Sequence, residues 1–196
     1  MSDDTIRILG ISGSLRRGSY STMALRGLQE AVRQGAQMQI HSLEEIPLYN
    51  ADLDGDIKPP AVVAFKAAIQ ECCGMVLVSP EYNYGMPGVL KNALDWASRP
   101  AYASVLKGKP VLTMTTSPGI GGGVRAHAQL RQTLAGTLSR LVTTPEVLIA
   151  AVHTKVEGDR LTDATSLKFM TEAFDLLLAE IGRGKRVSSS RNRVLY

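Results

Sequence analysis

Short apolar runs alternate along the chain with longer segments in which apolar residues recur every three or four positions. The apolar runs predict strands at residues 6–11, 74–79, 110–116 and 146–149, and the alternation of residues 38–43 predicts a further strand. The recurring positions predict helices over 22–33 and 125–141, helices that open at Pro59 and Pro60 and at Pro87, and a last helix through 167–181 capped near Thr162 or Asp163. A strand is thus followed by a helix five times.

Several of the predicted strands are apolar throughout, and residues 74–79, Gly-Met-Val-Leu-Val-Ser, are an example. Such strands are typical of parallel sheets that helices cover on both faces. The repeated strand–helix order therefore predicts an α/β fold with a parallel sheet. Ligands of these sheets bind beyond the carboxyl ends of the strands, so we expect the site in the loops that follow the first, third and fourth strands.

The composition is that of an ordinary globular domain, with 196 residues of which 44% are hydrophobic and 20% charged. We expect one domain over residues 1–183 and a basic C-terminal tail at 184–196, where much of the net charge of +4 is concentrated. Such a charge run is typical of a solvated tail. A nucleic-acid-binding arm is the alternative, but no aromatic residue lies among these basic residues before Tyr196, which makes nucleic acid an unlikely partner.

The cysteines and histidines exclude further classes of site. Cys72 and Cys73 are adjacent, and neighbouring cysteines rarely form a disulfide because the ring is strained. The three histidines lie far apart, without a cysteine or histidine at ligand spacing, so we expect no metal site. The acidic start and the absence of long apolar runs predict a cytoplasmic protein without a membrane segment.

The loop after the first strand, residues 10–21, has the composition of a phosphate receptor. It supplies four hydroxyls and a guanidinium, from Ser12, Ser14, Ser19, Ser21 and Arg16. The helix that follows adds backbone N–H groups. The glycines do not fit the dinucleotide motif G-x-G-x-x-G, and Ser19 stands where a P-loop requires lysine. We therefore expect a phosphate that belongs neither to a dinucleotide nor to a triphosphate.

The loops after the third and fourth strands are suited to a flat ligand. In residues 80–88, Tyr82 and Tyr84 can lie against a ring, and the Asn83 amide can bond a heteroaromatic edge. Residues 115–123 contain a glycine-rich stretch that lets the backbone approach a ligand closely. Together with a phosphate receptor, these loops favour a phosphorylated planar molecule, and FMN fits that description.

Two segments are distinctive: residues 13–21, Gly-Ser-Leu-Arg-Arg-Gly-Ser-Tyr-Ser, and residues 79–96, Ser-Pro-Glu-Tyr-Asn-Tyr-Gly-Met-Pro-Gly-Val-Leu-Lys-Asn-Ala-Leu-Asp-Trp. Both closely resemble the NADPH-dependent FMN reductase family, and within it the bacterial quinone and chromate reductases. The resemblance extends over nearly the whole chain. It implies a flavodoxin-like, doubly wound sheet of five parallel strands in the order 2-1-3-4-5, with helices on both faces.

The resemblance also implies bound FMN, NADPH or NADH as electron donor, small-molecule acceptors such as quinones, and a homo-oligomer, either dimer or tetramer. The FMN phosphate would be held by Ser14, Arg16, Ser19, Tyr20 and Ser21. The isoalloxazine ring would be lined by Pro80, Glu81, Tyr82, Asn83, Tyr84 and Gly85, with Ser117 at its far edge. The family usually has asparagine at the position of Ser21. We expect no catalytic side chain, and we interpret Glu81 as a group that also caps or pairs structurally.

Two other functions are compatible with some of these features. An electron-carrying flavodoxin would share the fold, but such carriers are typically acidic and lack the Pro-Glu-Tyr-Asn loop; steady turnover of NADPH would distinguish an enzyme from a carrier. A serine hydrolase could combine Ser12 with His127 or His153. Its elbow motif, G-x-S-x-G, would need glycine where Ser14 stands.

Overall fold

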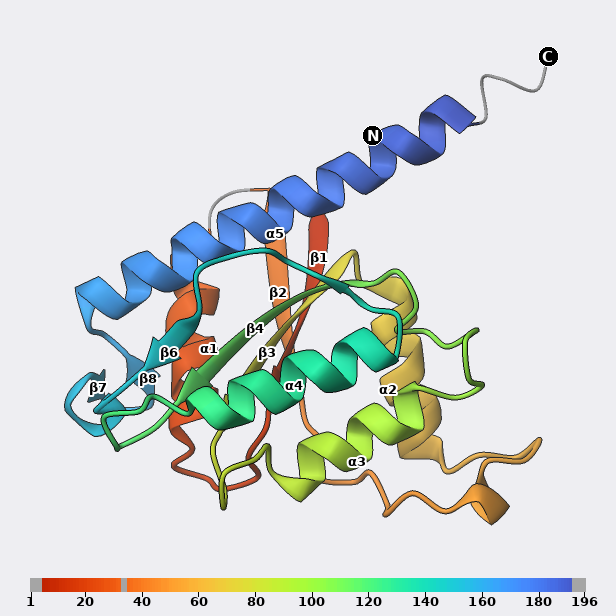
Figure 1. Ribbon diagram of the computed structural model, residues 1–196, viewed down its shortest axis with the longest axis horizontal. Coiled ribbons are helices and arrows are strands. Elements are labelled where there is room, and N and C mark those ends of the chain that lie inside the picture. Colours follow the sequence, from red (N-terminus) through yellow and green to blue (C-terminus); the bar gives the residue numbers. More distant parts are fainter. Residues whose placement is uncertain (1–4, 33–34, 192–196) are drawn as a thin grey trace.

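Figure 1 shows a computed structural model of the chain, which describes residues 5–32 and 35–191, with residues 185–191 described by their backbone only. One sheet contains β1 (Ile6–Ser12), β2 (Ala36–His41), β3 (Gly74–Pro80), β4 (Pro110–Thr116), β5 (Arg140–Leu141) and β6 (Val147–Ile149). Its order is β2-β1-β3-β4-β5, β6 also pairs with β4, and all of these pairs are parallel. The predicted strand order is thus confirmed.

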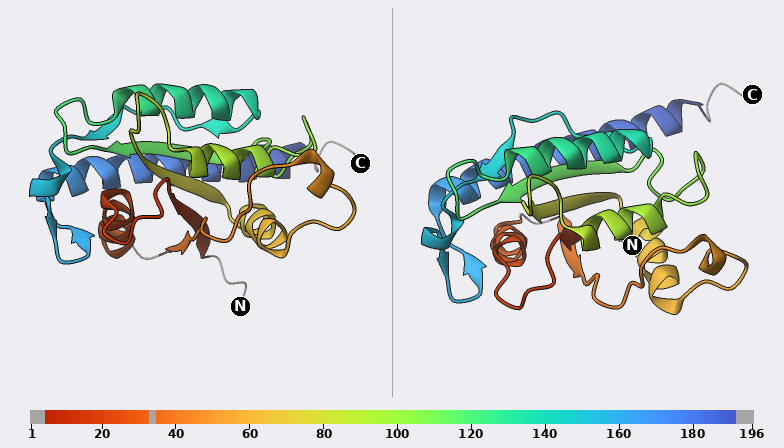
Figure 2. Two further views of the ribbon diagram at one scale, coloured as in Figure 1. Left: turned by 90° about the horizontal axis from the view of Figure 1, so that it is seen from below. Right: turned by 60° about the horizontal axis from the view of Figure 1, so that its bottom comes forward.

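Helices cover both faces of the sheet (Figures 1 and 2). They are α1 (Tyr20–Ala31), α2 (Pro60–Glu71), α3 (Gly88–Ala97), α4 (Val124–Gly136) and α5 (Ala164–Arg191). The core between the sheet and α1 and α5 contains Val76 and Val78, whereas the core between the sheet and α2, α3 and α4 contains Met75 and Leu77. Successive residues of β3 therefore point into opposite cores, which explains why the strand is apolar throughout.

Smaller elements complete the described chain: the short 3-10 helices η1 (Ala51–Leu53) and η2 (Val152–Thr154), and an antiparallel hairpin of β7 (Val156–Glu157) and β8 (Arg160–Leu161). The carboxylate of Asp163 accepts a hydrogen bond from the backbone N–H of Ser166 at 2.8 Å, so the predicted cap of the last helix is confirmed. Among the described residues, no helix has both the length and the apolar character needed to cross a bilayer.

The fourth helix and the fifth strand differ from the prediction. The helix expected to reach residue 141 ends at Gly136, and Leu138 has a left-handed backbone with φ of 61°. Leu141 instead lies in β5, opposite Val111 of β4. The predicted strand at 146–149 is confirmed as β6, but it is only the second of two short strands. β5 begins soon after α4 ends, so Leu141 of the strand fits the spacing of the helix by chance.

The long connection between β2 and α2 is held in place by α3. The indole Nε1 of Trp96 and the amide Nδ2 of Asn92 both donate to the carbonyl of Pro47, at 2.8 and 2.9 Å. The Asn92 Oδ1 accepts from the backbone N–H of Tyr49 at 2.7 Å, and the Tyr49 ring packs edge-on against Trp96. The second half of the distinctive segment 79–96 therefore has a structural role.

Two expectations concern the cysteines and the C-terminus. Cys72 and Cys73 are both free, as their adjacency predicts. Helix α5 continues to Arg191, so it extends into the segment expected to form a basic tail, and residues 192–196 lie outside the described residues. The division of the chain at residue 183 stays a prediction.

Candidate functional site

A pocket of about 220 Å³ lies where β1, β3 and β4 end. Its lining residues are Ser14, Arg16, Ser19, Tyr20, Ser21, Pro80, Glu81, Tyr82, Thr116, Ser117 and Pro118. The three loops selected from the sequence therefore converge, and nine of the twelve predicted residues line one pocket. Thr116 and Pro118 were missed; their position beside Ser117, at the end of a buried strand, was the available signal.

The first loop and the start of α1 form an environment that favours an anion. Ser19 is the N-cap of α1, and its Oγ accepts from the N–H of Thr22 at 3.4 Å. The first turn of α1 contains no acidic residue, and the guanidinium of Arg16 lies 5.0 Å from the centre of the Tyr20 ring. The positive end of the helix dipole, the hydroxyls and the guanidinium therefore all favour the binding of an anion here.

Two hydrogen bonds between side chains connect this loop to the end of β4 and to the loop after β3. The hydroxyls of Ser21 and Thr116 are 2.8 Å apart and buried, which joins the first turn of α1 to the end of β4. The hydroxyls of Ser14 and Tyr82 are 3.3 Å apart, which joins the first loop to the second. The relative positions of the three loops are thus fixed by the protein's own contacts.

The predicted residues that do not line the pocket lie in a tight turn. Tyr82 and Gly85 exchange two backbone hydrogen bonds, at 2.9 and 3.0 Å. Between them, Asn83 and Tyr84 both have left-handed backbones, with φ of 49° and 67°, which is the geometry of a type I′ turn. This turn reverses the chain and leaves both side chains exposed, so it lies outside the pocket lining in the described structure.

The carboxylate of Glu81 caps the start of α4. Its Oε2 accepts from the backbone N–H groups of Arg125 and Ala126, at 2.9 and 3.1 Å, and its Oε1 lies 3.7 Å from the Arg125 guanidinium. A negative charge is stabilised at this end of a helix. The interpretation of Glu81 as a capping group is confirmed, and the same residue lines the pocket.

The glycines of the third loop serve the turn into α4. Gly122 and Gly123 have φ of 61° and 87°, and a Cβ on Gly122 would lie 2.8 Å from the Cβ of Leu148. The hydroxyl of Thr115 donates to the carbonyl of Gly122 at 2.8 Å. The pocket is lined by the residues before these glycines, Thr116, Ser117 and Pro118. The glycines thus have a structural role in the turn, and their close approach to a ligand stays a prediction.

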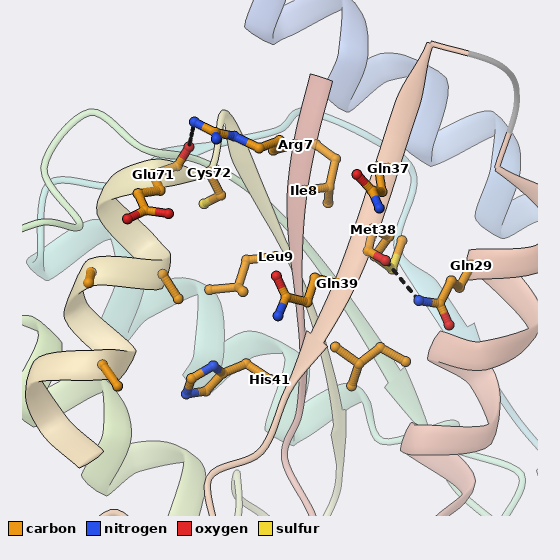
Figure 3. A pocket seen from close by; sticks show the side chains of 14 residues that line it. Arg7, Ile8, Leu9, Gln29, Gln37, Met38, Gln39, His41, Glu71 and Cys72 are labelled. Atoms are coloured by element: carbon orange, nitrogen blue, oxygen red, sulfur yellow. Dashed lines mark hydrogen bonds between the residues drawn. The ribbon is translucent and has the colours of Figure 1, made fainter. Parts of the chain in front are cut away.

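A larger groove of about 720 Å³ lies at the β2 edge of the sheet (Figure 3). Gln39 and His41 of β2 point toward α2, and the amide of Gln29 donates to the carbonyl of Met38 at 2.7 Å. The Arg7 guanidinium, at one end of the groove, donates to the Glu71 carbonyl. This groove lies away from the loops that follow β1, β3 and β4, so the smaller pocket, with its convergent anion donors, is the candidate site.

Two of the residues considered for a serine hydrolase, Ser12 and His127, have other partners. The Nε2 of His127 lies 3.0 Å from the hydroxyl of Thr113, and its Nδ1 lies 3.5 Å from a carboxylate oxygen of Glu146. The hydroxyl of Ser12 instead accepts from the hydroxyl of Thr22 at 2.9 Å. Ser12 and His127 therefore do not form a catalytic pair.

Burial lowers the pKa of His127, although its hydrogen bond with Thr113 and the charge of Glu146 oppose this. In the unfolded chain, where the histidine pKa is near 6.5, His127 binds a proton more readily than in the native state. The free energy of unfolding should therefore fall as the pH drops below about 6.5. Urea unfolding between about pH 7 and 5 should show a shallower fall of the free energy of unfolding for His127→Gln than for the parent protein. Equal slopes in the two proteins would contradict this.

The chain matches the model of a known protein family. The model of the NADPH-dependent FMN reductase family matches residues 6–154. The chain belongs to this family. FMN is accordingly its cofactor and NAD(P)H its electron donor.

Individual members of the FMN reductase family match most of the chain. An NAD(P)H-dependent FMN reductase of Pseudomonas aeruginosa is 40% identical over 178 residues, which are 90% of this chain and 95% of that protein. A 2-hydroxy-1,4-benzoquinone reductase of a Burkholderia species is 34% identical over 183 residues, or 93% and 99% of the two chains. The solved structure of FerB, an NAD(P)H:(acceptor) oxidoreductase of Paracoccus denitrificans, has a TM-score of 0.81 at 30% identity and covers 91% of this chain and 98% of its own.

The residues of the pocket fit the cofactor of the FMN reductases. Serine hydroxyls, the Arg16 guanidinium and the start of α1 are the donors that a phosphate ester requires. Tyr82 and Pro80, on the adjacent side, present flat and apolar surfaces. This donor set distinguishes the pocket from the groove at the β2 edge.

Proposed function

We propose that this FMN reductase transfers two electrons from NAD(P)H to quinones at the pocket formed by the loops after β1, β3 and β4. The observation that carries the proposal is the convergence of phosphate donors and the segment Pro80–Glu81–Tyr82 at one pocket. The Burkholderia relative is named a 2-hydroxy-1,4-benzoquinone reductase, and a relative in Escherichia coli K12, 39% identical over 158 residues, is named a quinone reductase. These names support quinones as the acceptors.

Each part of the pocket has a proposed role. Bound FMN supplies the capacity to accept a hydride from NAD(P)H and to deliver two electrons to an acceptor. The phosphate is held by Ser14, Arg16, Ser19, Tyr20 and Ser21. The hydroxyl of Ser21 keeps its hydrogen bond with Thr116 as it contacts the phosphate. Pro80, Glu81 and Tyr82 orient the ring, the turn of Asn83, Tyr84 and Gly85 borders it, and Ser117 lies at its far edge. Backbone N–H groups of the loop after β4 stabilise the negative charge that reduction brings.

Steady-state kinetics test this function. We expect NAD(P)H and the quinone to use the same open side of the pocket, so that the oxidised nucleotide leaves before the quinone enters. Double-reciprocal plots at several quinone concentrations should therefore be parallel, as in a ping-pong mechanism. NAD(P)H alone should bleach the visible absorbance of the protein, and added quinone should restore it. Intersecting plots would contradict the shared site, and a lack of turnover would favour an electron carrier.

The surroundings of the pocket support a homo-oligomer, a dimer or a tetramer. Large apolar side chains are exposed on the loops and helix start around it: Leu15, Tyr82, Tyr84, Ile120 and Val124. Ile120 is 98% exposed, and several exposed apolar side chains around one site are typical of protein interfaces. Sedimentation at micromolar concentration should give a mass of at least two chains, and a fully active monomer would contradict this expectation.

The proposal also includes a compartment and a domain boundary. Free thiols at Cys72 and Cys73 are suited to the reducing cytoplasm. We assign catalysis to residues 1–183 and treat 184–196 as a basic extension, because every residue that lines the pocket precedes this boundary.

A further inference from the structure

The turn beside the pocket has a backbone that its residues do not favour. Asn83 and Tyr84 both have left-handed φ values, and a bulky residue such as tyrosine rarely adopts one. Conformations of this kind persist only where the surrounding structure holds them. The contacts that hold the segment Glu81–Met86 therefore help to determine the shape of the pocket.

Besides the contact between the hydroxyls of Ser14 and Tyr82, one helix holds this segment at three places. Helix α4 offers the N–H groups of its first turn to the Glu81 carboxylate, before the turn. The Arg125 guanidinium lies 4.4 Å from the centre of the Tyr84 ring, in the middle of the turn. After the turn, the side-chain Oε1 of Gln129 accepts from the backbone N–H of Met86 at 2.7 Å. The segment is thus attached to α4 at its beginning, its middle and its end.

Gln129 also limits the room beside the turn. A Cβ on Gly85 would lie 2.6 Å from the Gln129 Oε1, so the amide fits closely against a residue that has no side chain. The Met86 N–H follows this glycine directly and needs an acceptor. Gln129 therefore fixes both the position of Gly85 and the direction of the chain as it leaves the turn.

We propose that Gln129 is a positioning residue for FMN binding, acting through its hydrogen bond to the Met86 N–H. Gln129 is not among the residues that line the pocket. It holds the turn, and through it Tyr82 and Glu81, in the arrangement that lines the pocket. Without the bond, part of the binding free energy is spent on ordering this segment. The inference rests on the proposed FMN site.

Three variants of the full chain isolate this hydrogen bond. Gln129→Met keeps the length of the side chain and a high helix propensity but removes the acceptor. Gln129→Glu keeps an acceptor oxygen at the same reach. Gln132→Met is the matched control, because Gln132 is exposed on the same helix and makes no side-chain hydrogen bond within the described part of the chain. FMN affinity is measured by quenching of free FMN fluorescence as apoprotein is added, and circular dichroism checks the fold.

We expect Gln129→Met to weaken FMN binding about tenfold, with Gln129→Glu within about threefold of the parent and Gln132→Met unchanged. Parent affinity in Gln129→Met, or equal weakening in Gln129→Met and Gln129→Glu, would overturn the proposal. Arg16→Ala separates this failure from failure of the site. If Arg16→Ala weakens binding and Gln129→Met does not, only the role of Gln129 is wrong; if neither does, the site itself is wrong.

Discussion

Replacing Arg16 by alanine should weaken FMN binding by about tenfold to a hundredfold. Arg16 lines the pocket near the N-cap of α1, and its guanidinium lies over the Tyr20 ring, which limits its freedom before a phosphate arrives. A hydrogen bond to a charged group contributes about 1.5–3 kcal/mol, which corresponds to this range of affinity. The dissociation constant from FMN fluorescence quenching would measure the effect.

The neighbouring arginine provides the control. Arg17 is exposed and is absent from the pocket lining that the structure describes, so Arg17→Ala should change FMN affinity by less than about threefold. Both substitutions remove one positive charge, so a general electrostatic effect would act on them alike. Equal losses in the two variants would show that Arg16 has no specific role.

Replacing Trp96 by alanine should lower the free energy of unfolding by about 3–5 kcal/mol, the range for truncation of a large buried aromatic residue. Trp96 is fully buried, and the change removes both the hydrogen bond to Pro47 and the contact with the Tyr49 ring. Urea unfolding of the FMN-free protein would measure it, because bound ligand adds its own stabilisation.

Two further variants separate packing from hydrogen bonding at this position. Trp96→Phe keeps an aromatic ring but loses the donor to Pro47, so its loss should be smaller than that of the alanine variant. Tyr102→Ala removes an aromatic ring that is 76% exposed, so it should have a small effect. A loss below about 1 kcal/mol in Trp96→Ala would mean that the stability of the fold does not depend on Trp96.

The sequence predicted the features that depend on local patterns. The apolar run of β3 indicated a strand buried on both faces, and the serines before α1 indicated an anion site. Features that depend on partners far apart in the sequence could not be predicted from it. Nothing near Gln129 indicates its bond to Met86, and nothing near Asn92 indicates its bonds to residues 47 and 49. Likewise, the spacing of Leu141 fits both a helix and the strand in which it lies.

The interruption between β5 and β6 bears on how members of the family can differ in length. β5 pairs with the start of β4 and β6 with its end, so residues 143–146 leave the sheet between two independently fixed registers. Thr143 and Pro145 are exposed there, whereas the N–H of Val142 is still bonded to Val111. Residues added at this point would therefore leave the register of both strands unchanged, and we expect the fold to tolerate a peptide tag inserted there.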